Sequence, residues 1–118
     1  MFTIMIVDDS LFMRNHLSKL LTKNGYEIIL AENGEMAVNT YRQSRPDVVL
    51  MDITMPRKDG LQALAEIREF DAMAKVIMLT ALDQELAATQ AIHLGARDFL
   101  VKPVPSNRLL MALQRVLE

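Results

Sequence analysis

Short, continuous apolar runs recur along this chain and constrain its fold more than any other feature. The runs are TIMIV (3–7), YEIIL (26–30), VVLM (48–51), KVIML (75–79) and DFLV (98–101). Most of them lack the polar alternation of a half-exposed strand, so they predict strands that are buried on both faces. The segments between them have helical spacing. Alternating strands and helices predict an α/β fold, a parallel sheet with helices on both of its faces.

Capping residues and apolar spacing predict five helices. We expect them from Ser10 to Asn24-Gly25, after Asn33-Gly34, from about Gly60 to Phe70, from near Asp83 to Gly95, and from near Ser106. In chain order, their expected buried faces are Met13, Leu17, Leu20 and Leu21; Ala37, Val38 and Tyr41; Leu61, Leu64 and Ile67; Leu86, Ala87, Gln90, Ala91 and Leu94; and Leu109, Ala112, Leu113 and Val116.

Length and composition exclude several classes of protein. The 118 residues suit one domain, 1–118, without a linker, and 51% of them are hydrophobic. A net charge of -2 without a basic run argues against nucleic-acid binding by this chain. No apolar stretch approaches the ~18 residues of a membrane span, and MFTIMIVDD lacks the charged start of a signal peptide. With no cysteine, we expect a soluble cytoplasmic domain.

Polar residues stand where the predicted strands end. They are Asp8-Asp9, Asp52, Thr80 and Lys102. Ligands bind at the carboxyl ends of the strands in parallel α/β sheets. Three carboxylates brought together repel one another, and a hard cation such as Mg²⁺ relieves that repulsion. The ammonium of Lys102 and the hydroxyl of Thr80 suit the oxygens of a phosphoryl group, so the set indicates phosphoryl transfer to a carboxylate.

Four motifs carry a resemblance to a known family. They are VDDS (7–10), PDVVLMDITMPRKDG (46–60), VIMLTA (76–81) and GARDFLVKPV (95–104). In this order and at this spacing, the chain resembles a response-regulator receiver domain and is most similar to the single-domain chemotaxis type. The resemblance covers the whole chain. It implies a flavodoxin-like, doubly wound sandwich of three layers, with strand order 2-1-3-4-5 adopted from the chemotaxis receivers themselves.

The resemblance assigns the acidic residues to a phosphorylation site. Asp52 matches the residue that accepts a phosphoryl group from a sensor histidine kinase or a phosphotransfer protein. Asp9 matches the direct ligand of Mg²⁺, and Asp8 its acidic neighbour, which reaches the metal through water. Thr54 would lend its backbone carbonyl to the metal. Mn²⁺ is a substitute ion in this reading.

The same resemblance describes a switch. Thr80 and Lys102 match the residues that bind phosphoryl oxygens, Phe99 matches an aromatic side chain that changes rotamer, and the Lys102-Pro103 bond is expected to be cis. Phosphorylation would then change the surface of the fourth helix, fifth strand and fifth helix, which controls a partner such as the flagellar motor or another regulator. Such a domain is no enzyme, since it catalyses only its own phosphorylation and dephosphorylation. We expect a monomer before phosphorylation and leave open a dimer after it.

Some positions depart from the commonest family pattern. Thr54 replaces longer or amide side chains, and Leu82 is apolar; both positions flank the path of the attacking water in the family. We predict that Leu82 slows the loss of the phosphoryl group. Val104 stands where a Phe is frequent, and Phe99 lacks the hydroxyl of the more common Tyr.

Apolar residues outside the core stripes form candidate partner contacts. Leu11 and Phe12 lie on the first turn after the acidic pair, where a phosphodonor has to arrive. Ile92, Leu110 and Leu117 lie on elements with which the family binds partners, although single surface leucines are common. The competing reading of His16 and His93 as metal ligands is weaker, since neither has a companion at metal-ligand spacing.

Three alternatives stay open. A flavin-binding domain of the same sheet order would need a phosphate-cradling loop after the first strand, whereas DDSLF is acidic. An aspartyl phosphatase would resemble a D-x-D pattern and carry a cap domain. The third alternative is the N-terminal receiver of a longer regulator whose output domain, such as a DNA-binding domain, is absent from this chain.

Overall fold

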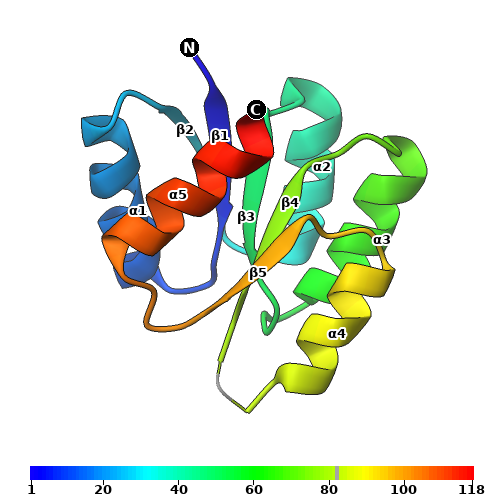
Figure 1. Ribbon diagram of the computed structural model, residues 1–118. Coiled ribbons are helices and arrows are strands. Elements are labelled where there is room, and N and C mark those ends of the chain that lie inside the picture. Colours follow the sequence, from blue (N-terminus) through cyan, green and yellow to red (C-terminus); the bar gives the residue numbers. More distant parts are fainter. Residues whose placement is uncertain (82) are drawn as a thin grey trace.

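A parallel sheet forms the centre of the molecule (Figure 1). The computed structural model describes residues 1–81 and 83–118, and within them five strands pair in the order β2-β1-β3-β4-β5. The strands are β1 (Thr3–Val7), β2 (Glu27–Ala31), β3 (Val48–Asp52), β4 (Val76–Thr80) and β5 (Asp98–Val101). This is the doubly wound, flavodoxin-like order that the resemblance to receiver domains implies. All pairings are parallel, so the carboxyl ends of all five strands lie on the same side of the molecule, which we call the carboxyl edge of the sheet.

Helices cover both faces of the sheet and make it the middle one of three layers. The helices are α1 (Leu11–Lys23), α2 (Gly34–Ser44), α3 (Gly60–Phe70), α4 (Glu85–His93) and α5 (Ser106–Leu117). One core lies between the sheet and α1 and α5, and the other lies between the sheet and α2, α3 and α4. Neighbouring residues of one strand point to opposite cores, as Ile4 and Met5 do on β1.

The apolar runs reflect burial in the centre of the sheet. Every residue of β3 and β4 is buried, and so is β1 from Ile4 to Val7. The edge strands β2 and β5 are partly exposed. A strand between two neighbours and two helix layers needs apolar side chains on both faces, which explains why the central runs are continuous.

Side-chain caps begin the first three helices, and the first of them, Ser10, is the N-cap that the sequence predicts. Ser10 accepts a hydrogen bond from the N–H of Met13, and Asn33 and Asp59 do the same for the third residue after each of them. Asp59 therefore serves as a helix cap, as its position before Gly60 indicates. Among the described residues, no helix combines the length and the apolar character that crossing a membrane needs.

The expected face of α4 is correct for Ala91, which is buried, and for Ala87, which packs against the core, but wrong for its three larger side chains. The helix begins at Glu85 rather than near Asp83, and it buries Ala88 and Ala91. Leu86 is 84% exposed, and Gln90 and Leu94 are exposed as well. The physical reason is close packing: α4 lies against β4 and the short edge strand β5, where small alanine side chains fit and leucines do not.

Candidate functional site

Three carboxylates meet at the carboxyl edge of the sheet. Asp8 and Asp9 follow β1, Asp52 ends β3, and the two strands are neighbours. One oxygen of each residue lies within 4.8 Å of the others. Asp8 is 1% exposed and Asp52 is 8% exposed, whereas Asp9 is open to solvent. The arrangement brings hard oxygen atoms together at a partly open position, where they could hold a metal ion.

Lys102 supplies a positive charge to this cluster. Its Nζ lies 3.2 Å from Oδ2 of Asp8 and 3.3 Å from Oδ1 of Asp52. Burial raises the pKa of Asp52, Lys102 opposes the rise, and the charges of Asp8 and Asp9 add to it. One ammonium does not balance three carboxylates, so the site favours a further cation. The Lys102-Pro103 bond is cis, as predicted.

Asp8 is held by the start of α1. Its Oδ1 accepts the N–H of Ser10 at 2.9 Å, and its backbone carbonyl accepts a hydrogen bond from the guanidinium of Arg14 at 2.7 Å. Arg14 also pairs with Glu32 after β2, at 3.8 Å. Sequence reasoning missed Arg14. A signal for it exists, because side chains on the first turn of a helix point back toward the strand that precedes it.

Thr80 lies at the end of β4 and is buried. Its hydroxyl donates to the carbonyl of Ala81 at 3.1 Å, and its own carbonyl accepts the N–H of Lys102 at 2.8 Å. The ends of β4 and β5 are thereby joined beside Asp52. Phe99, on the neighbouring strand β5, is partly exposed.

The loop between β3 and α3 is anchored at several points. The N–H of Gly34 donates to the carbonyl of Lys58 at 3.0 Å, and the N–H of Gly60 donates to the carbonyl of Ile53 at 2.7 Å. Thr54, within this loop, is exposed, and its hydroxyl accepts a hydrogen bond from the amide of Gln84. Sequence reasoning missed this contact. Leu82 lies outside the residues that the structure describes.

The candidate partner contacts divide into two groups. Phe12 is 74% exposed, and Leu11 and Ile92 are exposed as well. Leu110 and Leu117 are partly buried and pack against the core beneath α1 and α5, so they offer less open surface to a partner than the other three residues. Both lie beside the buried stripe of α5 and turn inward with it. Met111 is the exposed apolar residue of that helix, which the sequence pattern missed.

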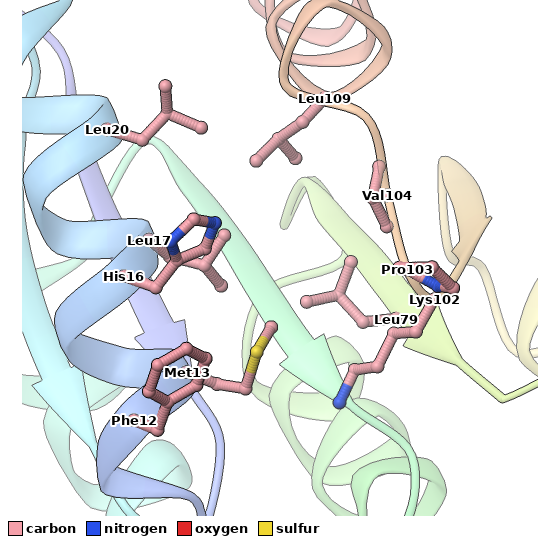
Figure 2. A pocket seen from close by; sticks show the side chains of 10 residues that line it. All are labelled: Phe12, Met13, His16, Leu17, Leu20, Leu79, Lys102, Pro103, Val104 and Leu109. Carbon is pink, nitrogen blue, oxygen red and sulfur yellow. The ribbon is translucent and has the colours of Figure 1, made fainter.

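A hollow of about 380 Å³ lies beside the acidic cluster, between α1 and the segment that leads from β5 into α5 (Figure 2). Its lining is mostly apolar and comprises Phe12, Met13, His16, Leu17, Leu20, Leu79, Lys102, Pro103, Val104 and Leu109. The ring of Phe12 stacks on that of His16, with centroids 6.1 Å apart. Figure 2 shows Phe12 at one rim, and the amino group of Lys102 points away from the end lined by Leu20 and Leu109.

Comparisons with known proteins agree with this geometry. The response regulator receiver domain family matches residues 4–114. The chemotaxis protein CheY of Bacillus subtilis is 48% identical over 97% of this chain and 96% of its own length. The regulatory protein AtoC of Escherichia coli is 39% identical over 98% of this chain but only 25% of its own length.

A solved structure shows the same fold. It is the complex of CheX, CheY, BeF3 and Mg from Borrelia burgdorferi, whose matched chain has a TM-score of 0.94 and 39% identity. The match covers 99% of this chain and 90% of that one.

Proposed function

The chain belongs to the family of response regulator receiver domains, and we propose that it is a phosphorylation-activated switch of a two-component system. Asp52 accepts the phosphoryl group in this proposal, from a sensor histidine kinase or a phosphotransfer protein. The supporting observation is the convergence of Asp8, Asp9 and Asp52 around the ammonium of Lys102. A nearly buried carboxylate beside a cation and two further acids suits phosphoryl transfer better than a structural ion pair.

The carboxylates fit Mg²⁺, with Mn²⁺ as a substitute. Asp8, Asp9 and Asp52 offer hard oxygen ligands, and the backbone carbonyl of Thr54 would add another. The raised pKa of Asp52 is consistent with this reading: burial raises it, Lys102 opposes the rise, and the charges of Asp8 and Asp9 add to it, so one ammonium leaves part of the negative charge unbalanced. The Borrelia burgdorferi complex contains Mg, which supports the same ion here. When bound, the ion neutralises the charge that develops on the transferring phosphoryl group.

Asp52 and Lys102 have different roles in the transfer of the phosphoryl group. An oxygen of Asp52 bonds to the phosphorus of a phosphohistidine, the P–N bond breaks, and its electron pair returns to the imidazole. Lys102, whose Nζ is 3.3 Å from Oδ1 of Asp52, pairs with a phosphoryl oxygen. Water later attacks the acyl phosphate and restores the carboxylate. In this proposal the domain catalyses only these two reactions on itself.

The switch follows from the hydroxyl of Thr80. In the present arrangement it donates to the carbonyl of Ala81. A phosphoryl dianion on Asp52 is a stronger acceptor, so Thr80 turns toward it and leaves space into which Phe99 can rotate. The local change in charge then biases the surface of α4, β5 and α5 between two arrangements, and this surface controls the downstream protein.

The phosphodonor docks on α1 in this proposal. Leu11 and Phe12 are exposed on its first turn, next to Asp9, and Phe12 also lines the apolar hollow that reaches Lys102. A donor helix could place apolar side chains in this hollow while it presents its histidine to Asp52.

Similarity to CheY supports a role in chemotaxis or motility, with the flagellar motor or another regulator as the target. The alternative is a receiver within a longer regulator that has an output domain. AtoC favours this alternative, since the chain matches only 25% of that protein.

Incubation with acetyl phosphate, with and without Mg²⁺, tests the proposal by intact mass. We expect one phosphoryl adduct that requires Mg²⁺ and is absent in Asp52→Asn. Asp83→Asn is the matched control, because Asp83 is exposed and lies outside the acidic cluster. An adduct that persists in Asp52→Asn would overturn the assignment.

A further inference from the structure

The side chain of Gln84 joins two loops at the mouth of the site. Its Oε1 accepts the N–H of Ala81 at 3.0 Å, and its Nε2 donates to the hydroxyl of Thr54. Thr54 is the second residue after Asp52, and Ala81 directly follows Thr80. Since β3 and β4 are paired neighbours, one amide group links the loops that leave two adjacent strands. We call this arrangement the Gln84 clamp.

Gln84 occupies the N-cap position of α4, where a side chain normally accepts a hydrogen bond from the start of the helix. Within the described residues, however, its side chain caps no backbone group of the helix. Ser10, Asn33 and Asp59, the caps of the first three helices, all accept a backbone N–H of their own helix. The amide of Gln84 is therefore committed to the loops beside Asp52 rather than to the start of its helix.

The clamp also restrains the peptide next to Thr80. The N–H of Ala81 donates to the side chain of Gln84, while its carbonyl accepts both the hydroxyl of Thr80 and the backbone N–H of Gln84, each at 3.1 Å. Ala81 is thus held on both sides of its backbone. The position of the Thr80 hydroxyl depends on the same peptide.

Thr54 and Ala81 are exposed, whereas Asp52 is nearly buried. The clamp therefore joins two exposed residues that lie, in the sequence, two positions after Asp52 and one position after Thr80. We propose that Gln84 is a positioning residue that holds these two loops together and slows the approach of water to phosphorylated Asp52. This inference rests on the proposed function. In the step concerned, a water oxygen bonds to phosphorus, the bond from phosphorus to Asp52 breaks with its electron pair returning to the carboxylate, and phosphate and a proton leave.

The decisive variants remove the hydrogen bonds and keep the shape. Gln84→Met retains the length of the side chain, and Thr54→Val removes the hydroxyl while leaving the backbone carbonyl in place. After phosphorylation with acetyl phosphate and removal of the donor, we expect each variant to lose the phosphoryl group roughly 3- to 10-fold faster than wild type, the effect of one or two ordinary hydrogen bonds. The doubly substituted chain should be no faster than the faster single variant, since both remove the same link.

Two controls separate positioning from general damage. Gln90→Met makes the same substitution on the exposed face of α4 and should leave the rate unchanged. Urea unfolding should show that all variants are folded under the conditions of the assay.

The outcomes are distinct. Wild-type loss rates in both Gln84→Met and Thr54→Val would overturn the clamp while leaving Asp52 as the phosphoacceptor. Multiplying effects in the double variant would also overturn it, because independent effects mean that the two side chains do not act through one link. Failure of the wild-type chain to form an adduct at Asp52 would overturn both the clamp and the proposed function.

Discussion

Replacing Gly60 with alanine should displace the backbone of Asp52 and so impair the acidic site. Gly60 opens α3, and a Cβ built on it would lie 2.2 Å from the carbonyl oxygen of Asp52 and 2.9 Å from Cα of Ile53. Ordinary Cβ contacts begin at 3.4 Å, so the methyl group overlaps the carbonyl oxygen by 1.2 Å (3.4 − 2.2). Both obstructing atoms belong to the backbone. The end of β3 or the start of α3 must therefore shift by about 1 Å.

This overlap leads to two expected magnitudes. Overpacking of this kind costs about 1–3 kcal/mol, and the better helix propensity of alanine offsets at most about 1 kcal/mol of that. A shift of about 1 Å at a reacting group costs on the order of 100-fold in rate. For Gly60→Ala we expect a loss of roughly 1–2 kcal/mol in the free energy of unfolding and a fall of at least about 10-fold in the rate of phosphorylation of Asp52.

Urea unfolding measures the first quantity, and intact mass during incubation with acetyl phosphate and Mg²⁺ measures the second. Gly25→Ala is the control. Gly25 has a φ of +91° with nothing within 4 Å of its Cβ position. It precedes β2 and so lies at the amino ends of the strands, whereas the site lies at their carboxyl ends. It should lose about 1 kcal/mol from backbone strain and keep the wild-type rate. A Gly60→Ala protein with wild-type stability and rate would refute the argument from close approach.

Three further perturbations test the electrostatics, the packing and the donor surface. Burial raises the pKa of Asp52, so the ionised carboxylate destabilises the metal-free fold at neutral pH. Asp52→Asn should therefore unfold at a higher urea concentration than wild type at neutral pH. This gain in stability should vanish as the pH falls through the folded-state pKa, because the wild-type carboxyl then takes up its proton. Tyr41→Phe removes the hydrogen bond that the hydroxyl donates to Asp71 at 2.7 Å, which should cost about 1–2 kcal/mol. Because that bond lowers the pKa of Asp71, the cost should be complete above the unfolded pKa of 3.8 and shrink as the pH falls through the lower folded value; an equal cost at all pH values would contradict this. Phe12→Ala should slow phosphorylation by a histidine kinase about 10-fold and leave the reaction with acetyl phosphate unchanged. The control Met111→Ala, on α5, should slow neither reaction. An unaltered kinase rate in Phe12→Ala would mean that Phe12 only packs against its neighbours.

Local patterns were sufficient to predict the layers of the fold. The central strands read as continuous apolar runs because two helix layers cover them, and the N-cap Ser10 follows from a short-range hydrogen bond. The acidic cluster was predictable as well, since parallel strands bring their carboxyl ends to one edge whatever the details of packing. Its residues are separated in sequence but stand at equivalent places in the repeating strand–helix pattern.

The face of α4 was not predictable in the same way. Helical spacing alone allows a stripe around Ala91 that includes Leu86 and Leu94, or one around Ala91 that includes Ala88 instead. The distance between the helix and the edge of the sheet decides between them, and that distance depends on how α3, β4 and β5 pack. Leucine side chains facing the sheet would hold α4 farther from β4 and β5 than its packing there allows.

By itself, the sequence determined the α/β architecture, the caps and the set of reactive residues at the strand ends, because these depend on periodicity and on chain direction. Only the tertiary structure decided how those residues are held. The side chain of Gln84, for example, contacts both Thr54 and Ala81. Thr54 and Gln84 are 30 residues apart, and no periodic pattern encodes their meeting. Such contacts form where loops from different strands converge, so their geometry exists only once the sheet has assembled.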